Sequence, residues 1–183
     1  MAQPGGTDGG TPAQTGTRAA WPQRMLERYY DDYRQLARKV LSGHQARAVF
    51  QPTELAHEAA LQLMRLEKMD VASRTHFLSL SARVMRHVLI DEIRRFRAQK
   101  RQAPPLMTQW PADSAPAGFD LEAFDDALTR LMAADPERAR IVEQRFYGGL
   151  TLEEIAEVSG ASLSTVKRQW RVARAWLLDD LAD

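Results

Sequence analysis

Residues 151–178 read TLEEIAEVSGASLSTVKRQWRVARAWLL and decide the fold of the C-terminal half of the chain. In the first part of this stretch, apolar side chains recur at helical i, i+3, i+4 spacing, at Leu152, Ile155 and Ala156. Ser159-Gly160 predicts the end of that helix, because glycine tolerates the left-handed conformation that a tight helix exit needs. Ser162 is a good N-cap for a second helix. The stretch therefore predicts two helices joined by a turn.

The second predicted helix has two different sides. Its apolar stripe consists of Leu163, Val166, Trp170, Ala173 and Leu177. At about 100° per residue, a basic ridge faces away from this stripe, and it consists of Ser164, Lys167, Arg168, Arg171 and Arg174. A solvated face of an ordinary amphipathic helix is the simplest alternative. The turn, the N-cap, the apolar stripe and the basic ridge are all consistent with the same two helices. We therefore interpret the stretch as a helix-turn-helix whose second helix reads DNA in the major groove.

The composition limits the classes of protein to consider. A chain of 183 residues with 44% hydrophobic residues suits one or two small globular domains. The net charge is only +1, so any nucleic-acid role must rest on local patches. Cysteine is absent, which excludes disulfides, thiolate zinc sites and cysteine catalysis. With no apolar run of membrane-spanning length and no signal peptide, we expect a cytoplasmic protein without a membrane partner.

Strand signals are scarce, and helical periodicity predicts an all-α fold. Helices are expected over 21–41, from 51–53 onward, over 73–100, over 119–132 and from 135–136 to 146. Residues 102–118 contain four prolines, at positions 104, 105, 111 and 116, which forbid a continuous helix. We therefore predict a disordered tail (1–20), a first helical domain (21–101), a flexible linker (102–118) and a second helical domain (119–183). Such a linker allows two binding surfaces to sit far apart.

The C-terminal half of the third predicted helix is strongly basic. Two acids, Asp91 and Glu92, accompany seven cations, which are Arg83, Arg86, Arg94, Arg95, Arg97, Lys100 and Arg101. Cations in a last helical turn favour the helix dipole by a few tenths of a kcal/mol, about enough to account for two or three of them. Contact with phosphates is the better account of the others.

Two other classes of protein share some of these features. A stand-alone helix-turn-helix regulator would explain the C-terminal half, but it would give the basic third helix no function. Such a regulator would also bind DNA as a dimer, and the sequence shows no heptad pattern for a dimer interface. A helical metal hydrolase would need a ligand set built on His57, Glu58, His76 and His87. The H-E-x-x-H motif requires a second histidine where Leu61 stands. We therefore predict no enzyme, no catalytic residue, no metal and no cofactor.

Two segments carry a family resemblance. Residues 145–177 read RFYGGLTLEEIAEVSGASLSTVKRQWRVARAWL, and residues 83–95 read RVMRHVLIDEIRR. They resemble region 4 and region 2.3–2.4 of bacterial sigma factors of the sigma-70 family, extracytoplasmic-function (ECF) group. The resemblance covers about Leu26 to Leu178. It implies a protein that binds core RNA polymerase through its first domain, opens the −10 element with that domain, and reads the −35 element with the second, so that transcription starts at a promoter.

The resemblance also assigns residues to the two promoter elements. Contacts with the −35 element would come from Ser164, Thr165, Lys167, Arg168, Arg171 and Arg174. Contacts with −10 DNA would come from Arg83, Arg86, His87, Arg94 and Arg95. His87 stands where the family usually has asparagine, so we expect the −10 preference to depart from the usual one.

The segment QPTELAHE, residues 51–58, matches the start of the family's polymerase-binding helix. The family usually has an acidic cluster like DAEDLVQE there, whereas this chain has Gln51 and Thr53 in place of two acids and keeps Glu54. The resemblance implies polymerase contacts at Gln51, Thr53, Glu54, His57 and Glu58, and the reduced charge implies weaker pairing with a basic partner.

Thr53 suggests how the charge could be restored. A phosphate on Thr53 would add about −2 charge at a helix start, where backbone N–H groups and the helix dipole stabilise it. The Q-P-T sequence resembles the signature of an ECF subgroup that includes kinase-controlled members. We hypothesise that a Ser/Thr kinase switches polymerase binding on, with an anti-sigma factor as the other candidate for control. Alternatively, Thr53 is only a helix-start residue and the interface is re-tuned.

Overall fold

The computed structural model describes residues 21–41, 49–66, 71, 73–100, 105–108 and 119–182. Within these residues the chain forms eight helices and one pair of two-residue strands. The predicted all-α fold is therefore confirmed. The predicted tail over 1–20 lies outside the described residues, as does most of the predicted linker.

The N-terminal half consists of α1 (Trp21–Arg28), α2 (Tyr30–Leu41), α3 (Pro52–Met64) and α4 (Arg74–Gln99). The helix predicted over 21–41 is two helices, which meet at Tyr29. Helical hydrogen bonds continue through the junction, since Tyr29 N–H donates to Met25 at 2.9 Å and Tyr33 N–H donates to Tyr29 at 2.9 Å. The Tyr29 ring packs on Phe77 of α4, with the ring centroids 5.9 Å apart.

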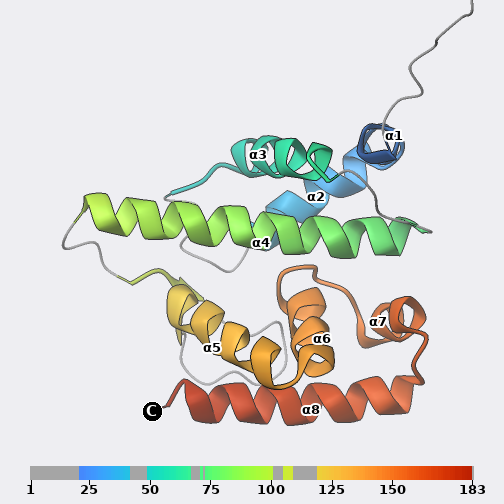
Figure 1. Ribbon diagram of the computed structural model, residues 1–183, viewed down its shortest axis with the longest axis vertical. Coiled ribbons are helices and arrows are strands. Elements are labelled where there is room, and N and C mark those ends of the chain that lie inside the picture. The colour runs from blue at the N-terminus through green and yellow to red at the C-terminus, as the bar shows by residue number, and fades with distance from the viewer. Residues whose placement is uncertain are drawn as a thin grey trace, which may run out of the picture.

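The long helix α4 has α1–α3 on one side and the C-terminal helices on the other (Figure 1). Ser73 caps its start, where the hydroxyl accepts a hydrogen bond from His76 N–H at 3.1 Å. Buried residues occur on more than one side of α4, among them Phe77, Met85 and Ile93. A helix that is buried on two sides can hold two sets of neighbours together.

The C-terminal half consists of α5 (Leu121–Ala134), α6 (Pro136–Phe146), α7 (Leu152–Ser159) and α8 (Leu163–Asp180). Asp135 caps α6, since its carboxylate accepts from Arg138 N–H at 3.0 Å, and Pro136 occupies the first helical position. The helix predicted from position 119 begins two residues later. Asp120 caps it by accepting from Glu122 N–H at 3.2 Å.

A short strand pair precedes α5. Strand β1 (Met107–Thr108) pairs antiparallel with β2 (Phe119–Asp120), and Leu121 N–H donates to Leu106 at 2.9 Å. Leu106 is buried. The part of the predicted linker that the structure describes is therefore attached to the start of the C-terminal half. The domain limits that we predicted remain predictions.

The apolar core consists of two clusters. The larger one is continuous across both halves, with members from α2, α3 and α4 and from α5, α6 and α8. The smaller one is formed by Ile141, Leu150, Ile155 and Val166, and Trp170 packs against both clusters. The halves are thus packed together through α4, rather than held apart as the linker prediction allowed.

Candidate nucleic-acid and polymerase interfaces

The helix-turn-helix forms as predicted, and its helix ends are fixed by reciprocal caps. Thr151 Oγ1 accepts from Glu154 N–H at 3.1 Å, and the Glu154 carboxylate accepts from Thr151 N–H at 2.8 Å. Gly160 ends α7 with φ +68°. Ser162 then caps α8 by accepting from Thr165 N–H at 3.2 Å. These contacts set the angle at which α8 leaves the turn.

The apolar stripe attaches α8 to the rest of the half. Val166 is fully buried in the smaller cluster, and Ala173 and Leu177 are fully buried in the larger one. The basic ridge faces the other way. Its residues Ser164, Lys167, Arg168 and Arg171 are exposed, whereas Arg174 and the neighbouring Thr165 are half-buried. Lys167 Nζ lies 3.7 Å from Glu153 of α7.

Arg86 of α4 is in a different environment. Its side chain is buried, with 4% of the residue exposed. Arg86 Nε donates to Asp125 of α5 at 2.6 Å, and Nη1 donates to Glu143 of α6 at 2.7 Å. Burial alone would lower the pKa of Arg86, but the charge of Asp125 and the hydrogen bonds raise it overall, so the guanidinium stays charged. The Arg86 guanidinium also lies 5.6 Å from the Tyr147 ring centroid.

The other predicted −10 residues are divided between the two sides of α4. Arg94 Nη2 donates to Asp126 of α5 at 2.8 Å, although the Arg94 side chain is 46% exposed. Arg83 and His87 are exposed. Arg95 lies nine residues after Arg86, about 180° around the helix, and faces α3. The structure therefore does not bring these five residues onto one surface.

Further polar contacts join α4 to the C-terminal half. Gln144 Nε2 of α6 donates to Ser79 Oγ at 2.7 Å. His76 Nε2 lies 3.2 Å from the Val158 carbonyl oxygen of α7. Near the other end of α4, Arg97 pairs with Asp120 at 3.3 Å and also with Glu122. Sequence reasoning missed all of these pairs, because the partners are far apart along the chain.

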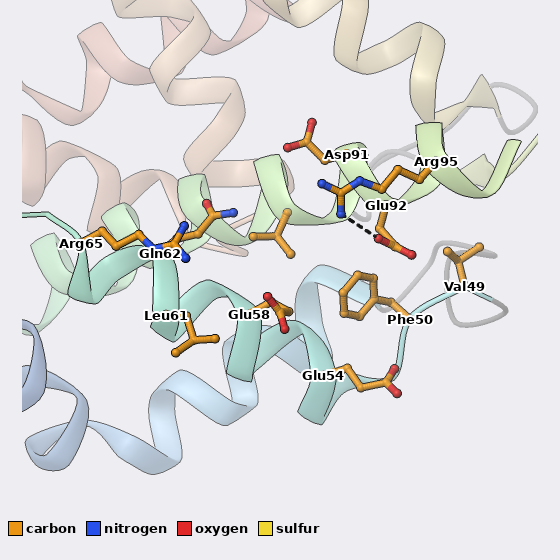
Figure 2. Close-up of a pocket in the computed structure, with 11 residues that line it drawn as sticks. Val49, Phe50, Glu54, Glu58, Leu61, Gln62, Arg65, Asp91, Glu92 and Arg95 are labelled. Atoms are coloured by element: carbon orange, nitrogen blue, oxygen red, sulfur yellow. Dashed lines mark hydrogen bonds and ion pairs between the residues drawn. The ribbon is translucent and has the colours of Figure 1, made fainter. Parts of the chain in front are cut away.

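A groove runs between α3 and α4 on the opposite side of α4 (Figure 2). Four carboxylates and two guanidinium groups line it, from Glu54, Glu58, Asp91, Glu92, Arg65 and Arg95. Figure 2 shows Glu92 and Arg95 joined by an ion pair on the side of α4 that faces α3. The distance between Arg95 Nη1 and Glu92 Oε2 is 3.3 Å. Apolar side chains, including the exposed Leu61, complete the lining. Sequence reasoning assigned Glu54 and Glu58 to polymerase binding, but it did not place Asp91 and Glu92 in the same groove.

The predicted polymerase-binding residues, Gln51, Thr53, Glu54, His57 and Glu58, are all exposed on α3 or at its start. Their side chains are divided between two hollows. Glu54 and Glu58 line the groove with α4, whereas Thr53 and His57 line a separate hollow beside α2 that also contains Arg34. The Glu54 carboxylate accepts from Gln51 N–H at 2.8 Å, so it also stabilises the start of α3.

The histidines considered for a metal site do not come together. Among the residues that the structure describes, no group of three or more His, Asp or Glu side chains is arranged to hold a metal ion. His57 lies on α3, whereas His76 and His87 lie three turns apart on α4. In the same part of the chain, no helix is both long enough and apolar enough to cross a bilayer.

A family model described as ECF sigma factor matches residues 12–183. The chain belongs to the ECF sigma factor family. This confirms the family predicted from residues 83–95 and 145–177, whereas the Q-P-T subgroup remains a prediction. Because the match includes the N-terminal half, a stand-alone helix-turn-helix regulator is not favoured.

Two known sigma factors are similar to the chain. It is 32% identical over 94 residues to the ECF RNA polymerase sigma factor RpoE of Cereibacter sphaeroides, which covers 49% of this chain and 50% of that protein. The chain thus matches about half the length of this curated relative. A co-crystal structure of the sigma factor RpoE with the anti-sigma factor NepR from Bartonella quintana matches 87% of this chain and 96% of that chain, at 14% identity and a TM-score of 0.38.

Proposed function

We propose that this protein binds core RNA polymerase and directs promoter recognition, melting and transcription initiation. The observation that carries the proposal is the exposed basic ridge on a capped and docked α8, in a chain that belongs to the ECF sigma factor family. A protein that works with bacterial polymerase acts in the cytoplasm. The proposed role is that of a regulatory subunit of the polymerase, not of an enzyme with its own substrate.

Recognition of the −35 element is assigned to the N-terminal part of α8. Lys167, Arg168 and Arg171 present their cationic groups to solvent, and Ser164 and Thr165 lie in the first turn, where a recognition helix contacts base edges. An arginine or lysine opposite guanine contributes about 1–3 kcal/mol of discrimination. Arg174, which is half-buried, is assigned to the phosphate backbone.

Opening of the −10 element is assigned to α4. Arg83 and His87 are exposed, so these side chains can reach a strand without a change in fold. Arg94 is half-exposed, but its guanidinium group is bonded to Asp126 of α5. Arg95 lies at the rim of the α3–α4 groove, and Arg86 is buried between the halves. Contact of Arg86 with DNA therefore requires the halves to separate.

The α3–α4 groove is assigned to core polymerase. Its four carboxylates outnumber its two guanidinium groups, so the groove suits a partner that presents cations beside apolar side chains. Asp91 and Glu92 supply acidic charge from α4 where Gln51 and Thr53 supply none from α3. This arrangement supports the interpretation of a re-tuned interface.

Run-off transcription tests the proposal. Purified core polymerase with this protein should start RNA at a defined promoter, and core polymerase alone should not. An Arg168→Ala/Arg171→Ala variant should reduce that product, whereas Arg38→Ala, which removes an exposed arginine from α2, should not. The proposal fails if no fragment from a promoter library gives a protein-dependent start.

Phosphorylation of Thr53 is proposed as one form of control. Thr53 is exposed in the first turn of α3, where a phosphate is stabilised by backbone N–H groups. Thr53 lines a hollow with Arg34 rather than with the groove acids, so the phosphate would lie near a guanidinium group and away from like charges. An anti-sigma factor is the alternative partner for control.

Two substitutions separate these forms of control. Thr53→Glu should increase core-polymerase binding relative to Thr53→Ala if the added charge is the switch, and phosphothreonine should be found at this position in cells. Equal binding by the two variants, with no phosphothreonine in cells, would leave Thr53 as a helix-start residue.

A further inference from the structure

A row of acids at the start of α5 pairs with a row of arginines on α4. The arginine row consists of Arg86, Arg94 and Arg97, and the acidic row consists of Asp120, Glu122, Asp125 and Asp126. Each arginine has a carboxylate of the acidic row within hydrogen-bonding distance or close to it. The N–O distances are 2.6 Å for Arg86–Asp125, 2.8 Å for Arg94–Asp126 and 3.3 Å for Arg97–Asp120.

The acidic row occupies the donors that DNA would need. The positions of the arginine row lie within about 80° of one another around α4, so its side chains form one surface. A guanidinium group donates the same N–H groups to carboxylates as to phosphates. With Arg86 only 4% exposed, a DNA strand has no path to its guanidinium while α5 and α6 lie against α4.

We propose that the acidic row is an internal substitute for DNA phosphates, which keeps the arginine row from promoter DNA until α5 and α6 move away from α4. The inference rests on the proposed function, since it concerns how the −10 contacts of α4 become available. The arginine row therefore has two alternative partners, a segment of its own chain and a nucleic-acid strand, and it binds one at a time.

The closed arrangement extends along most of α4. Contacts of the C-terminal half reach from His76 to Arg97, which is about 30 Å along the helix axis. The α3–α4 groove lies on the other side of α4 and contains Arg95. Polymerase can therefore bind the groove while the arginine row is still covered, so binding of core polymerase and engagement of −10 DNA are separate steps.

A reversible cross-link between the halves tests this proposal. Ser79 and Gln144 lie opposite each other across the interface, with their side chains hydrogen-bonded at 2.7 Å. The chain has no cysteine, so a Ser79→Cys/Gln144→Cys variant carries only the introduced pair. A short bis-maleimide with a reducible disulfide in its spacer would join the two. The cross-linked protein should bind core polymerase as before but give at least tenfold less run-off product, and reduction of the spacer should restore the product.

Single-cysteine variants, Ser79→Cys alone and Gln144→Cys alone, treated with the same reagent, are the matched controls and should remain active. Full activity of the cross-linked protein would overturn the proposal, as would loss of core-polymerase binding, because the loss of product would then have another cause. If neither the cross-linked nor the reduced protein starts RNA, the proposed function itself is wrong.

Charge variants provide a second measurement, because amide substitutions remove the charge of two acids of the row and keep the size of their side chains nearly constant. Glu122→Gln/Asp126→Asn removes two acids of the row, and Glu137→Gln/Asp179→Asn removes two exposed acids elsewhere in the same half. Affinity for a single-stranded −10 oligonucleotide should rise up to about tenfold for the first variant. An equal rise for the second would reflect net charge alone and would contradict the proposal.

Discussion

The arginines of α8 and those of α4 both lie in segments that resemble sigma-factor regions, yet Arg86 of α4 has surroundings unlike those of the α8 arginines. On α8, Arg168 and Arg171 are exposed on the side opposite the apolar stripe. On α4, Arg86 is buried and binds carboxylates from two other helices. One helix presents its charge to solvent, and the other uses part of its charge to hold the molecule together.

This difference teaches that a run of cations in a sequence can have two physical roles at once. An exposed cation can contribute to DNA affinity, whereas a cation buried with acids contributes to folding. Removal of a buried partner lowers the free energy of unfolding far more than removal of an exposed one. The two roles can be separated by making the same substitution in both helices.

The largest effect is expected from Arg86→Ala. The substitution leaves Asp125 and Glu143 buried without their guanidinium group, so the free energy of unfolding should fall by about 3–5 kcal/mol. Arg168→Ala is the matched control and should change it by less than about 0.5 kcal/mol. Urea unfolding at neutral pH measures both. Equal stability of the two variants would show that Arg86 contributes no more to folding than the exposed Arg168 does.

An effect of the opposite kind is expected from Arg171→Ala. Stability should be unchanged, whereas binding to duplex DNA that contains the −35 element should weaken by about 1–3 kcal/mol if the side chain contacts a guanine. Fluorescence anisotropy at fixed salt measures the change, with Arg38→Ala as the control. An equal loss on a scrambled duplex would assign Arg171 to phosphate contact instead.

A substitution in the turn before α8 should have a smaller effect on stability than Arg86→Ala. Gly160 has φ +68°, and a Cβ added at this position would meet no other atom within 4 Å, so Gly160→Ala would be strained by its backbone alone. We expect a loss of roughly 1–2 kcal/mol in unfolding free energy. Glu157→Ala, an exposed change in α7, is the control. A stability equal to that of the unaltered protein would mean that the turn relaxes.

The smallest effect concerns pH. His87 is exposed on one side, but neighbouring protein atoms desolvate its imidazole, and this desolvation together with the nearby charge of Arg86 lowers the pKa of His87. The unfolded chain therefore takes up a proton more readily than the folded one, so stability should fall as the pH decreases through and below about 6.5. His87→Gln should reduce this slope, and His57→Gln serves as the comparison. Chemical unfolding at pH 7.5 and 5.5 gives the slope, and an unchanged slope in His87→Gln would contradict the assignment.

Local signals predicted the helices well. The cap at Ser162 and the exit at Gly160, both predicted, follow from chemistry within four residues of each position, which a sequence displays directly. The junction at Tyr29 has no such signal, since no glycine or proline stands there. The strand pair at 107–108 and 119–120 is too short to produce a visible alternation.

The partners of α4 could not be predicted in the same way. Arg86 pairs with residues 39 and 57 positions away, and only the folded chain brings them together. The exposed Val172 and Trp176 on α8 were also missed, because the apolar stripe was defined by helical spacing and both side chains lie outside it. The orientation of Arg95 could have been predicted, however, because helical spacing alone places Arg95 on the side of the helix opposite Arg86.

The attachment of α8 to two apolar clusters has a mechanical consequence for the reading of DNA. Ala173 and Leu177 fix one end in the larger cluster, and Val166 fixes the other in the smaller one. Ser164 lies about 20 Å from Leu177 along the helix axis. A tilt of about 5° at Leu177 would therefore displace Ser164 by nearly 2 Å. A hydrogen bond to a base tolerates only a few tenths of an ångström. A larger side chain at Ala173 would tilt α8 in this way. Such a substitution would therefore change which promoters are recognised, although no DNA-facing side chain is altered.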